Sequence, residues 1–205
     1  MIRPLLWLPL LAVSASATLA QEASLEKRAM KLHALASGTY CDEAGSGYVP
    51  DDAFQSWTFD YTPSWSDGSD TETVTLVQVF CTSGAYNVSH AFYWEREFDG
   101  LQPLSLAVPS FDIRYEVEDD IDSKVLGIDV TGMSTQAILV NAEFDPKAKV
   151  ITAHSLWRGL GDASSSGTWF FDDGQFTLVQ YEIDASYDGE ANPEIVVDYL
   201  AAQGG

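Results

Sequence analysis

Hydrophobic and polar residues alternate along most of the chain with the two-residue period of β-strands. Trp57, Phe59 and Tyr61 share one face of a strand expected at 55–61, and His90 and Trp94 share another at 86–97. The same pattern predicts strands at 72–82, 111–118, 125–131, 137–144, 150–157, 168–171 and 176–183. Residues 195–200 fit a last strand or a short helix. Asp173-Gly174, between two alternating runs, predicts a type I′ hairpin turn.

One segment has a helical period instead. Leu25, Ala29 and Leu32 form an apolar stripe within 23–37, Ser24 is a suitable N-cap, and Gly38 is expected as a left-handed C-cap. Since a parallel sheet needs crossover helices, the pattern predicts an all-β fold, a mostly antiparallel sandwich or barrel of hairpins with one N-terminal helix. The proline-containing segment 101–109 would be the seam between two subdomains, but one β-rich domain over 21–205 is the simpler organisation.

The first twenty residues have the three parts of a secretory signal. Arg3 is followed by an apolar run over 4–13 and by small residues that end at Ala20, the expected cleavage point. The apolar run is about half of the length that a bilayer span needs. We therefore expect a signal peptide at 1–20 and a periplasmic or secreted protein without a membrane span after cleavage. In an exported chain, the two cysteines, Cys41 and Cys81, are expected to form a disulfide.

The charge narrows the possible partners. The chain has 10 basic and 31 acidic residues, a net charge of −21, and loss of Arg3 with the signal would make it −22. No basic stripe exists that could hold nucleic acid or an anionic membrane. The acidity fits either a salty habitat or a basic partner, and the pattern leaves both open.

Sequence motifs of catalysis are absent: the chain has no nucleophile elbow, zinc-protease helix, phosphate loop or dinucleotide fingerprint. Its histidines, His33, His90 and His154, lack metal-ligand spacing, so no metal site is predicted. Carboxylates cluster at 67–72, at 118–122 and at 184–190, and such oxygen-rich turns are compatible with calcium as well as with simple solubility. No other cofactor is expected.

The segment between Trp157 and Trp169 carries the candidate ligand-binding residues. These are Arg158, Asp162, Ser164, Ser165 and Ser166, in a glycine-rich stretch that resembles a binding loop on a rigid scaffold. For Asp162 the pattern favours a role inside the turn, where its carboxylate would accept backbone N–H groups. For the serines, binding and turn-forming roles both stay open.

Short runs here resemble one family. They are Gly-Leu-Gly-Asp at 159–162, Ser-Ser-Gly-Thr-Trp at 165–169, the Asp-Gly-x-Phe hairpin at 173–176, Phe80 to Asn87, and Ala107-Val108-Pro109. The chain is similar, over about 75–190, to an exported bacterial family called domain of unknown function 1176. Many members have a cysteine after Gly-Leu-Gly-Asp, where this chain has Ala163, so any disulfide of that loop is missing. The resemblance implies export and a bacterial origin, and it transfers no catalytic residue.

Three functions follow as expectations. The first is a non-enzymatic binding or interaction module in the bacterial envelope, with an envelope protein as partner. The alternative is a small-molecule or calcium-binding domain that uses 158–168 or the acidic turns. The remote alternative is a carboxylate-dependent hydrolase with His90 or His154. The oligomeric state is not predicted.

Overall fold

The computed structural model describes residues 14–43 and 49–200, with side chains described over 25–41 and 49–200. Two helices, α1 (Ser14–Ala36) and α2 (Gly38–Glu43), precede the strands. The helix predicted at 23–37 is present but begins earlier, and Gly38 lies in α2 rather than in a left-handed cap. The signal predicted at 1–20 falls outside the described residues up to residue 13, and 14–20 form the first turns of α1. Neither described helix is both long and apolar enough to cross a membrane.

The described residues after α2 form β-strands joined by turns and loops, as predicted. The strands are β1 (Phe54–Tyr61), β2 (Glu72–Ser83), β3 (Val88–Arg96), β4 (Gly100–Leu104), β5 (Leu106–Tyr115), β6 (Val125–Gln136), β7 (Ile138–Val140), β8 (Glu143–Asp145), β9 (Val150–Leu156), β10 (Ser164–Asp172), β11 (Gln175–Asp184) and β12 (Glu194–Asp198). Asp173 and Gly174 have φ of 45° and 81°, so both have the positive φ that the predicted type I′ turn requires.

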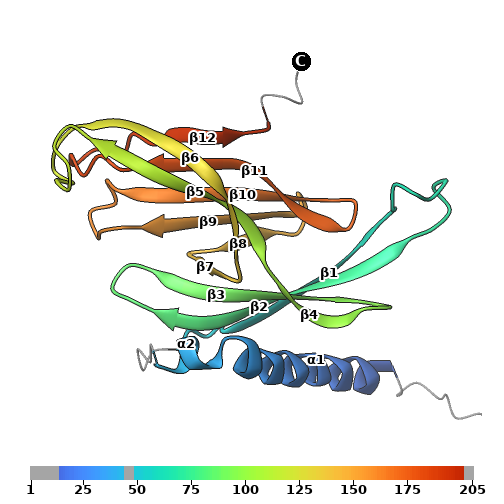
Figure 1. Cartoon of the computed structure of the whole chain (residues 1–205). Helices are drawn as coiled ribbons and strands as arrows, with labels where there is room; N and C mark the ends of the chain where they lie inside the picture. The colour runs from blue at the N-terminus through green and yellow to red at the C-terminus, as the bar shows by residue number, and fades with distance from the viewer. Residues whose placement is uncertain (1–13, 44–48, 201–205) are drawn as a thin grey trace, which may run out of the picture.

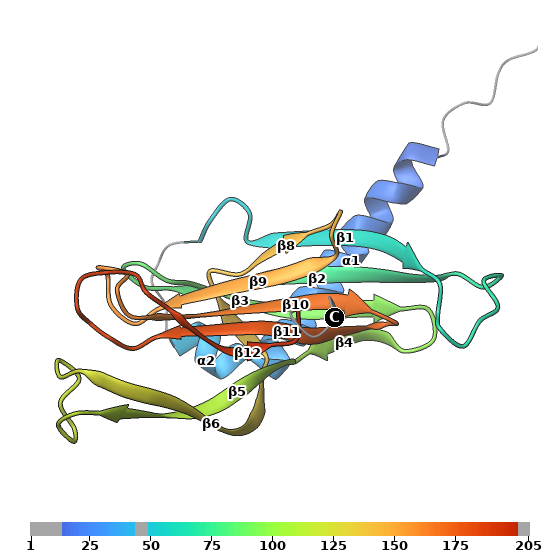
Figure 2. The same cartoon turned by 90° about the horizontal axis from the view of Figure 1, so that it is seen from above.

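All strand pairs are antiparallel. One sheet has the order β1-β2-β3-β4 with β7 also beside β3, and the other has the order β12-β11-β10-β9-β8. Strands β5 and β6 form a separate long hairpin. The two sheets overlap as layers, and the hairpin lies along one side of them (Figures 1 and 2). The short segment from β7 to β8 passes from the first sheet to the second.

The main core lies between these layers because alternate residues of each strand point inward. Leu76 and Phe92 come from the first sheet, Ile151 and Trp169 from the second, and Leu106 from the hairpin. All five are almost completely buried. A single apolar cluster therefore joins the two sheets and the hairpin.

A smaller core lies under α1, on the outer face of the first sheet. Ala29 packs there with Val77, Val79, Ala91 and Tyr93. The position of the helix along the sheet in Figure 1 is fixed by three further links.

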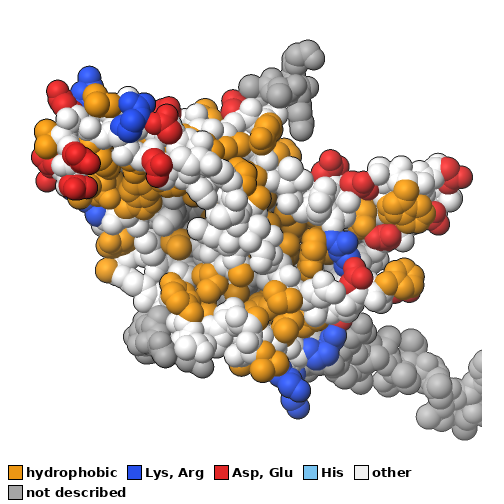
Figure 3. All heavy atoms as spheres, viewed as in Figure 1, with side chains coloured by type: hydrophobic (Ala, Val, Ile, Leu, Met, Phe, Trp, Pro, Cys, Tyr) orange, Lys and Arg blue, Asp and Glu red, His pale blue; other side chains and the backbone are white. Residues whose placement is uncertain are grey.

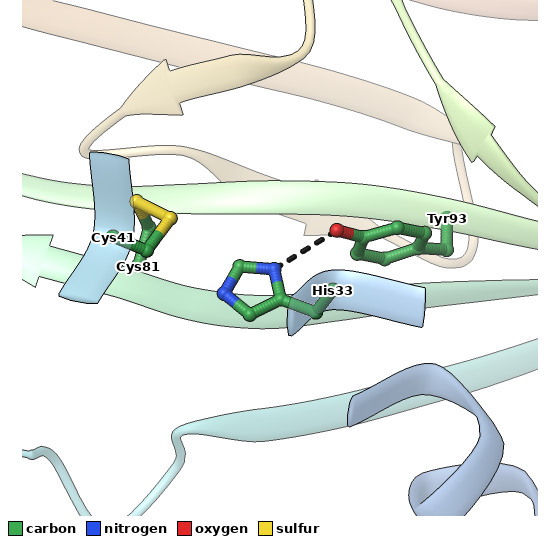
Figure 4. The surroundings of a disulfide bond; sticks show 4 residues. All are labelled: His33, Cys41, Cys81 and Tyr93. Atoms are coloured by element: carbon green, nitrogen blue, oxygen red, sulfur yellow. Dashed lines mark hydrogen bonds between the residues drawn. A yellow bond between two sulfur atoms is a disulfide. The ribbon is translucent and has the colours of Figure 1, made fainter. Parts of the chain in front are cut away.

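Those links are a disulfide, a hydrogen bond and an ion pair. Cys41 is bonded to Cys81 of β2, which confirms the predicted disulfide (Figure 4). The Nδ1 atom of His33 lies 2.9 Å from the Tyr93 hydroxyl, inside the protein. Arg28 forms a two-pronged ion pair with Glu95.

Three parts of the predicted strand pattern are wrong. No strand was predicted at 101–109, but these residues form most of β4 and the start of β5. The single strand predicted at 137–144 is divided into β7 and β8, because the chain changes sheets at Asn141 and Ala142. Finally, β10 begins at Ser164, so the three serines lie in a strand rather than in a loop.

Candidate functional site

Arg158 and Asp162 form the centre of a loop network. The Arg158 Nε atom donates to Asp162 Oδ1 over 2.6 Å, and a second guanidinium nitrogen bonds the other carboxylate oxygen. Arg158 also donates to the carbonyl oxygen of Tyr187 over 2.7 Å, and its guanidinium lies 5.2 Å from the centre of that ring. The pair thus ties the loop after β9 to the loop after β11.

Asp162 is buried and saturated with donors. Besides Arg158, the backbone N–H of Gly189 donates to Asp162 Oδ2 over 2.7 Å, and the side chain is only 2% exposed. The hydrogen bond from Arg158 is the main reason that the pKa of Asp162 is lowered to about 2. The carboxylate is therefore ionised at neutral pH, and the observed contacts give it the role inside the turn that the sequence favours.

The three serines are divided between the two faces of β10. Ser165 pairs with Ser155 and Ile183 on neighbouring strands and lines an inner cavity of about 270 Å³. Ser166 points to the other face, where its hydroxyl lies 2.7 Å from the Nδ1 atom of His154. Ser164 is buried beside Asp184. The five predicted ligand-binding residues therefore do not converge on one pocket.

Gly167 explains why this stretch of β10 is rich in small residues. A β-carbon on Gly167 would collide with the indole ring of Trp169. That indole lies against the strand and donates to the carbonyl oxygen of Ala107 over 2.7 Å. The lack of a side chain at Gly167 thus makes room for a core tryptophan that bonds the hairpin.

The three histidines lie in different parts of the structure. His33 bonds Tyr93 under α1, and His154 bonds Ser166 on an exposed face. His90 lines a different hollow, between the first sheet and the β7–β8 segment. Within the described residues, no group of three His, Cys, Asp or Glu side chains is arranged to hold a metal ion.

Two of the three acidic clusters come together at one end of the molecule. We call this the acidic end, and it consists of the β5–β6 tip (116–124) and the loop after β11 (184–194). The end of the hairpin carries many of the red carboxylates at the upper left of Figure 3. Between tip and loop is a hollow of about 630 Å³.

Carboxylates and apolar side chains share the lining of this hollow. The carboxylates are Asp122, Asp184, Asp188 and Glu194, Lys124 is the basic residue among the described lining residues, and the apolar part is Val125, Ile128, Ile183 and Ala185. Val117 and Ile121, on the tip, are also about half exposed. A charged rim above an apolar floor is suited to an amphipathic partner.

Backbone hydrogen bonds hold the carboxylates of the loop in place. Asp184 is buried and accepts the N–H groups of Ser186 over 3.1 Å and Asn192 over 2.7 Å. The N–H of Glu190 donates to Asp188 over 2.9 Å and is the main cause that lowers the pKa of Asp188. Tyr115 of the hairpin donates to the carbonyl oxygen of Ala185 over 3.2 Å, so the hairpin and the loop are joined. The negative charge is thus held in a defined arrangement.

The sequence shows the acidic clusters, but it does not show that two of them lie side by side in the folded protein. The hairpin tip and the loop are more than sixty residues apart in the chain. They meet because β5 packs against β11 and β6 against β12. The third cluster, at 67–72, lies on the β1–β2 turn.

These features define a disulfide-anchored antiparallel β protein with an acidic, partly apolar hollow at one end. A family model described as "Protein of unknown function (DUF1176)" matches residues 69–196, and the chain belongs to this family. The match covers both walls of the acidic hollow and leaves out α1, α2 and β1. No curated protein and no solved structure matches the chain.

Proposed function

We propose that this protein is a non-enzymatic binding module whose acidic end takes a basic, amphipathic segment of another protein. The observation that carries the proposal is the hollow of about 630 Å³ in which three exposed carboxylates, Asp122, Asp188 and Glu194, share the lining with an apolar floor. Carboxylates attract lysine and arginine side chains, and the apolar floor offers area for burial once they arrive. A partner with both kinds of side chain would use both parts of the lining.

Binding is favoured over hydrolysis because the fold already uses the best-placed acids. Asp184 is occupied by the N–H groups and hydroxyl of its own loop, and Asp162 by Arg158 and Gly189. A general acid needs a raised pKa, whereas the pKa values of Asp162 and Asp188 are lowered. The exposed Asp188 carboxylate is thus suited to presenting a fixed negative charge, whereas the Asp162 carboxylate is used inside the fold.

We further propose that the binding takes place in the envelope or outside the cell. A Cys41–Cys81 disulfide is typical of an oxidising compartment, and the first twenty residues have the pattern of a secretory signal. The partner is then an envelope or secreted protein with a basic surface. Recovery of the oxidised chain from a periplasmic or culture fraction, with residues 1–20 removed, is the direct check.

The binding test uses a short fluorescein-labelled peptide of alternating lysine and leucine. The test variant neutralises three exposed carboxylates of the hollow, Asp122→Asn, Asp188→Asn and Glu194→Gln. A control variant neutralises three exposed carboxylates elsewhere, Asp67→Asn, Asp70→Asn and Asp99→Asn, so that both carry the same net charge. We expect the test variant to lose about tenfold or more in affinity, from several charge contacts of up to about 1 kcal/mol each.

The control variant is expected to lose much less, because distant charges act only through the screened overall field. Equal losses in the two variants would show that net charge alone attracts the peptide, and the proposed site would be wrong. A lysine–glycine peptide that binds as tightly as the lysine–leucine peptide would contradict the role of the apolar floor.

A further inference from the structure

A second hollow lies away from the acidic end, on the inner side of the first sheet. It has a volume of about 520 Å³ and lies between strands β1 to β3 and the β7–β8 segment. The volume is in the range of small-molecule sites, about 300–1,000 Å³. Its lining includes the polar side chains of Asp52, Gln55, Gln78, His90, Asn141 and Glu143.

Polar side chains replace the core residues on this part of the sheet. Gln55 pairs with Gln78, Gln78 pairs with Phe92, and His90 is two residues before Phe92 on the same strand. Because side chains alternate across a strand, these polar groups share the inward face with the core residues Leu76 and Phe92. An inward face that changes from apolar to polar suggests that something other than protein fills the space.

His90 is a half-buried residue of the lining. Its Nδ1 atom is buried and has no hydrogen-bond partner in the described structure, so the accessible part of the ring is what faces the hollow. Burial also lowers the pKa of His90, so the ring is neutral at neutral pH and offers one donor and one acceptor.

The opposite wall of the hollow is rigid. Asn141 accepts the N–H of Val88 over 2.8 Å and donates to the carbonyl oxygen of His154 over 2.9 Å. Gln78 is buried and donates to the carbonyl oxygen of Ala142 over 3.0 Å. The β7–β8 segment is therefore fixed to both sheets, and a preformed site of this kind spares a ligand the cost of ordering the protein.

From this lining we infer that the His90 hollow binds a neutral saccharide. The carboxylates of Asp52 and Glu143 can accept hydrogen bonds from sugar hydroxyl groups, and Gln55 and His90 can both donate and accept. Trp57 and Phe144 add aromatic surface for an apolar sugar face. Their ring centres lie 5.2 Å apart, in an edge-to-face arrangement. No lysine or arginine is among the described residues of the lining, which disfavours an anion. This site is separate from the acidic end, and either proposal can fail without the other.

The test uses oxidised protein in which histidine is labelled with ¹⁵N. The chain has three histidines, so the ring signals of His90 can be assigned with the variant His90→Ala. The probes are glucose, N-acetylglucosamine, cellobiose and chitobiose, with spermidine as a cationic probe. We expect at least one saccharide to shift the His90 ring nitrogens in a saturable way, with a Kd of about 1 mM or lower.

For the variants His90→Ala and Gln55→Ala, binding of that saccharide is followed by tryptophan fluorescence. Each substitution should raise the Kd about fivefold to tenfold. His154→Ala is the matched control, because His154 is exposed and bonds Ser166 outside the hollow, and it should leave the Kd unchanged. If His90→Ala fails to fold, Gln55→Ala alone is compared with the wild type. Its loss should leave the fold intact, because the Gln55 side chain donates to the exposed Asp52 carboxylate. The inference is overturned if no saccharide shifts His90, if both variants bind as wild type does, or if only spermidine binds.

Discussion

At the residue scale, Asp162 allows a test of the loop network by pH. Its pKa of about 2 lies below the value of about 3.9 for an unfolded aspartate, so the folded protein binds this proton more weakly than the unfolded chain. The stability that it contributes is therefore complete above about pH 4 and is lost as the pH falls toward 2. Asp162→Asn should lower the melting temperature at pH 7 by roughly 5–10 °C.

The difference in melting temperature between wild type and Asp162→Asn should stay constant from pH 7 to pH 5 and then shrink toward pH 2. Asp145→Asn is the matched control. The pKa of Asp145 is also lowered, by the N–H groups of Ala148 and Lys147, but this carboxylate is exposed and has no arginine bonded to it. Equal melting of wild type and Asp162→Asn at pH 7 would contradict the structural role of the ion pair.

At the element scale, the alternation of hydrophobic and polar residues predicted the strands that have one buried and one exposed face. It did not predict strands that lack this pattern. The strand β1 is almost as predicted because Trp57, Phe59 and Tyr61 mark its inner face. The strand β4 was missed because Pro103 reads as a strand breaker. It is tolerated there because β4 lies at the sheet edge, where a missing N–H costs no ladder bond.

For the candidate sites, the sequence likewise shows the residues but not which of them lie close together. The carboxylates of the acidic end were visible in the sequence, but the pairing of a hairpin tip with a loop more than sixty residues away depends on packing. The sequence marks His90 only as a candidate residue of a carboxylate-dependent hydrolase, whereas in the structure it lines a hollow with Gln55 and Gln78 from other strands. Polar residues at inward strand positions were the signal that could have identified this hollow.

The disulfide gives a prediction about the N-terminal helices. It joins residues 40 positions apart, and closure of such a loop is worth about 4 kcal/mol by chain entropy. The double variant Cys41→Ser/Cys81→Ser should therefore lose up to about 4 kcal/mol in denaturant unfolding. Amide exchange should rise most in α1 and α2, because the bond fixes α2 directly to β2.

The same experiment tests how α1 is held. The contacts of Ala29 and His33 with the sheet remain in the double variant, so β2 and β3 should keep their protection. Reduction of the wild type should reproduce the effect and exclude a packing defect from the serines. Unchanged exchange in both helices would mean that the buried contacts, not the disulfide, hold them in place.

At the scale of the whole molecule, charge acts on stability and on binding in opposite directions. A net charge of −21 makes the folded chain repel itself, and most of the acidic residues are exposed. Raising NaCl from about 0.01 M to 1 M shortens the screening length from about 30 Å to about 3 Å, which weakens that repulsion. We expect the melting temperature to rise by a few degrees over this range. The control variant Asp67→Asn/Asp70→Asn/Asp99→Asn should show a smaller rise, because it starts with less repulsion.

The same increase in salt should weaken the binding of the lysine–leucine peptide, because screening also reduces the attraction between its lysines and the acidic hollow. Stability and affinity measured in one salt series should therefore change with opposite signs. A protein whose acidity served only a salty habitat would gain stability in that series without showing affinity for the peptide at low salt. Affinity that is high at low salt, that falls as the melting temperature rises, and that depends on Asp122, Asp188 and Glu194 would assign the charge at this end to a basic partner.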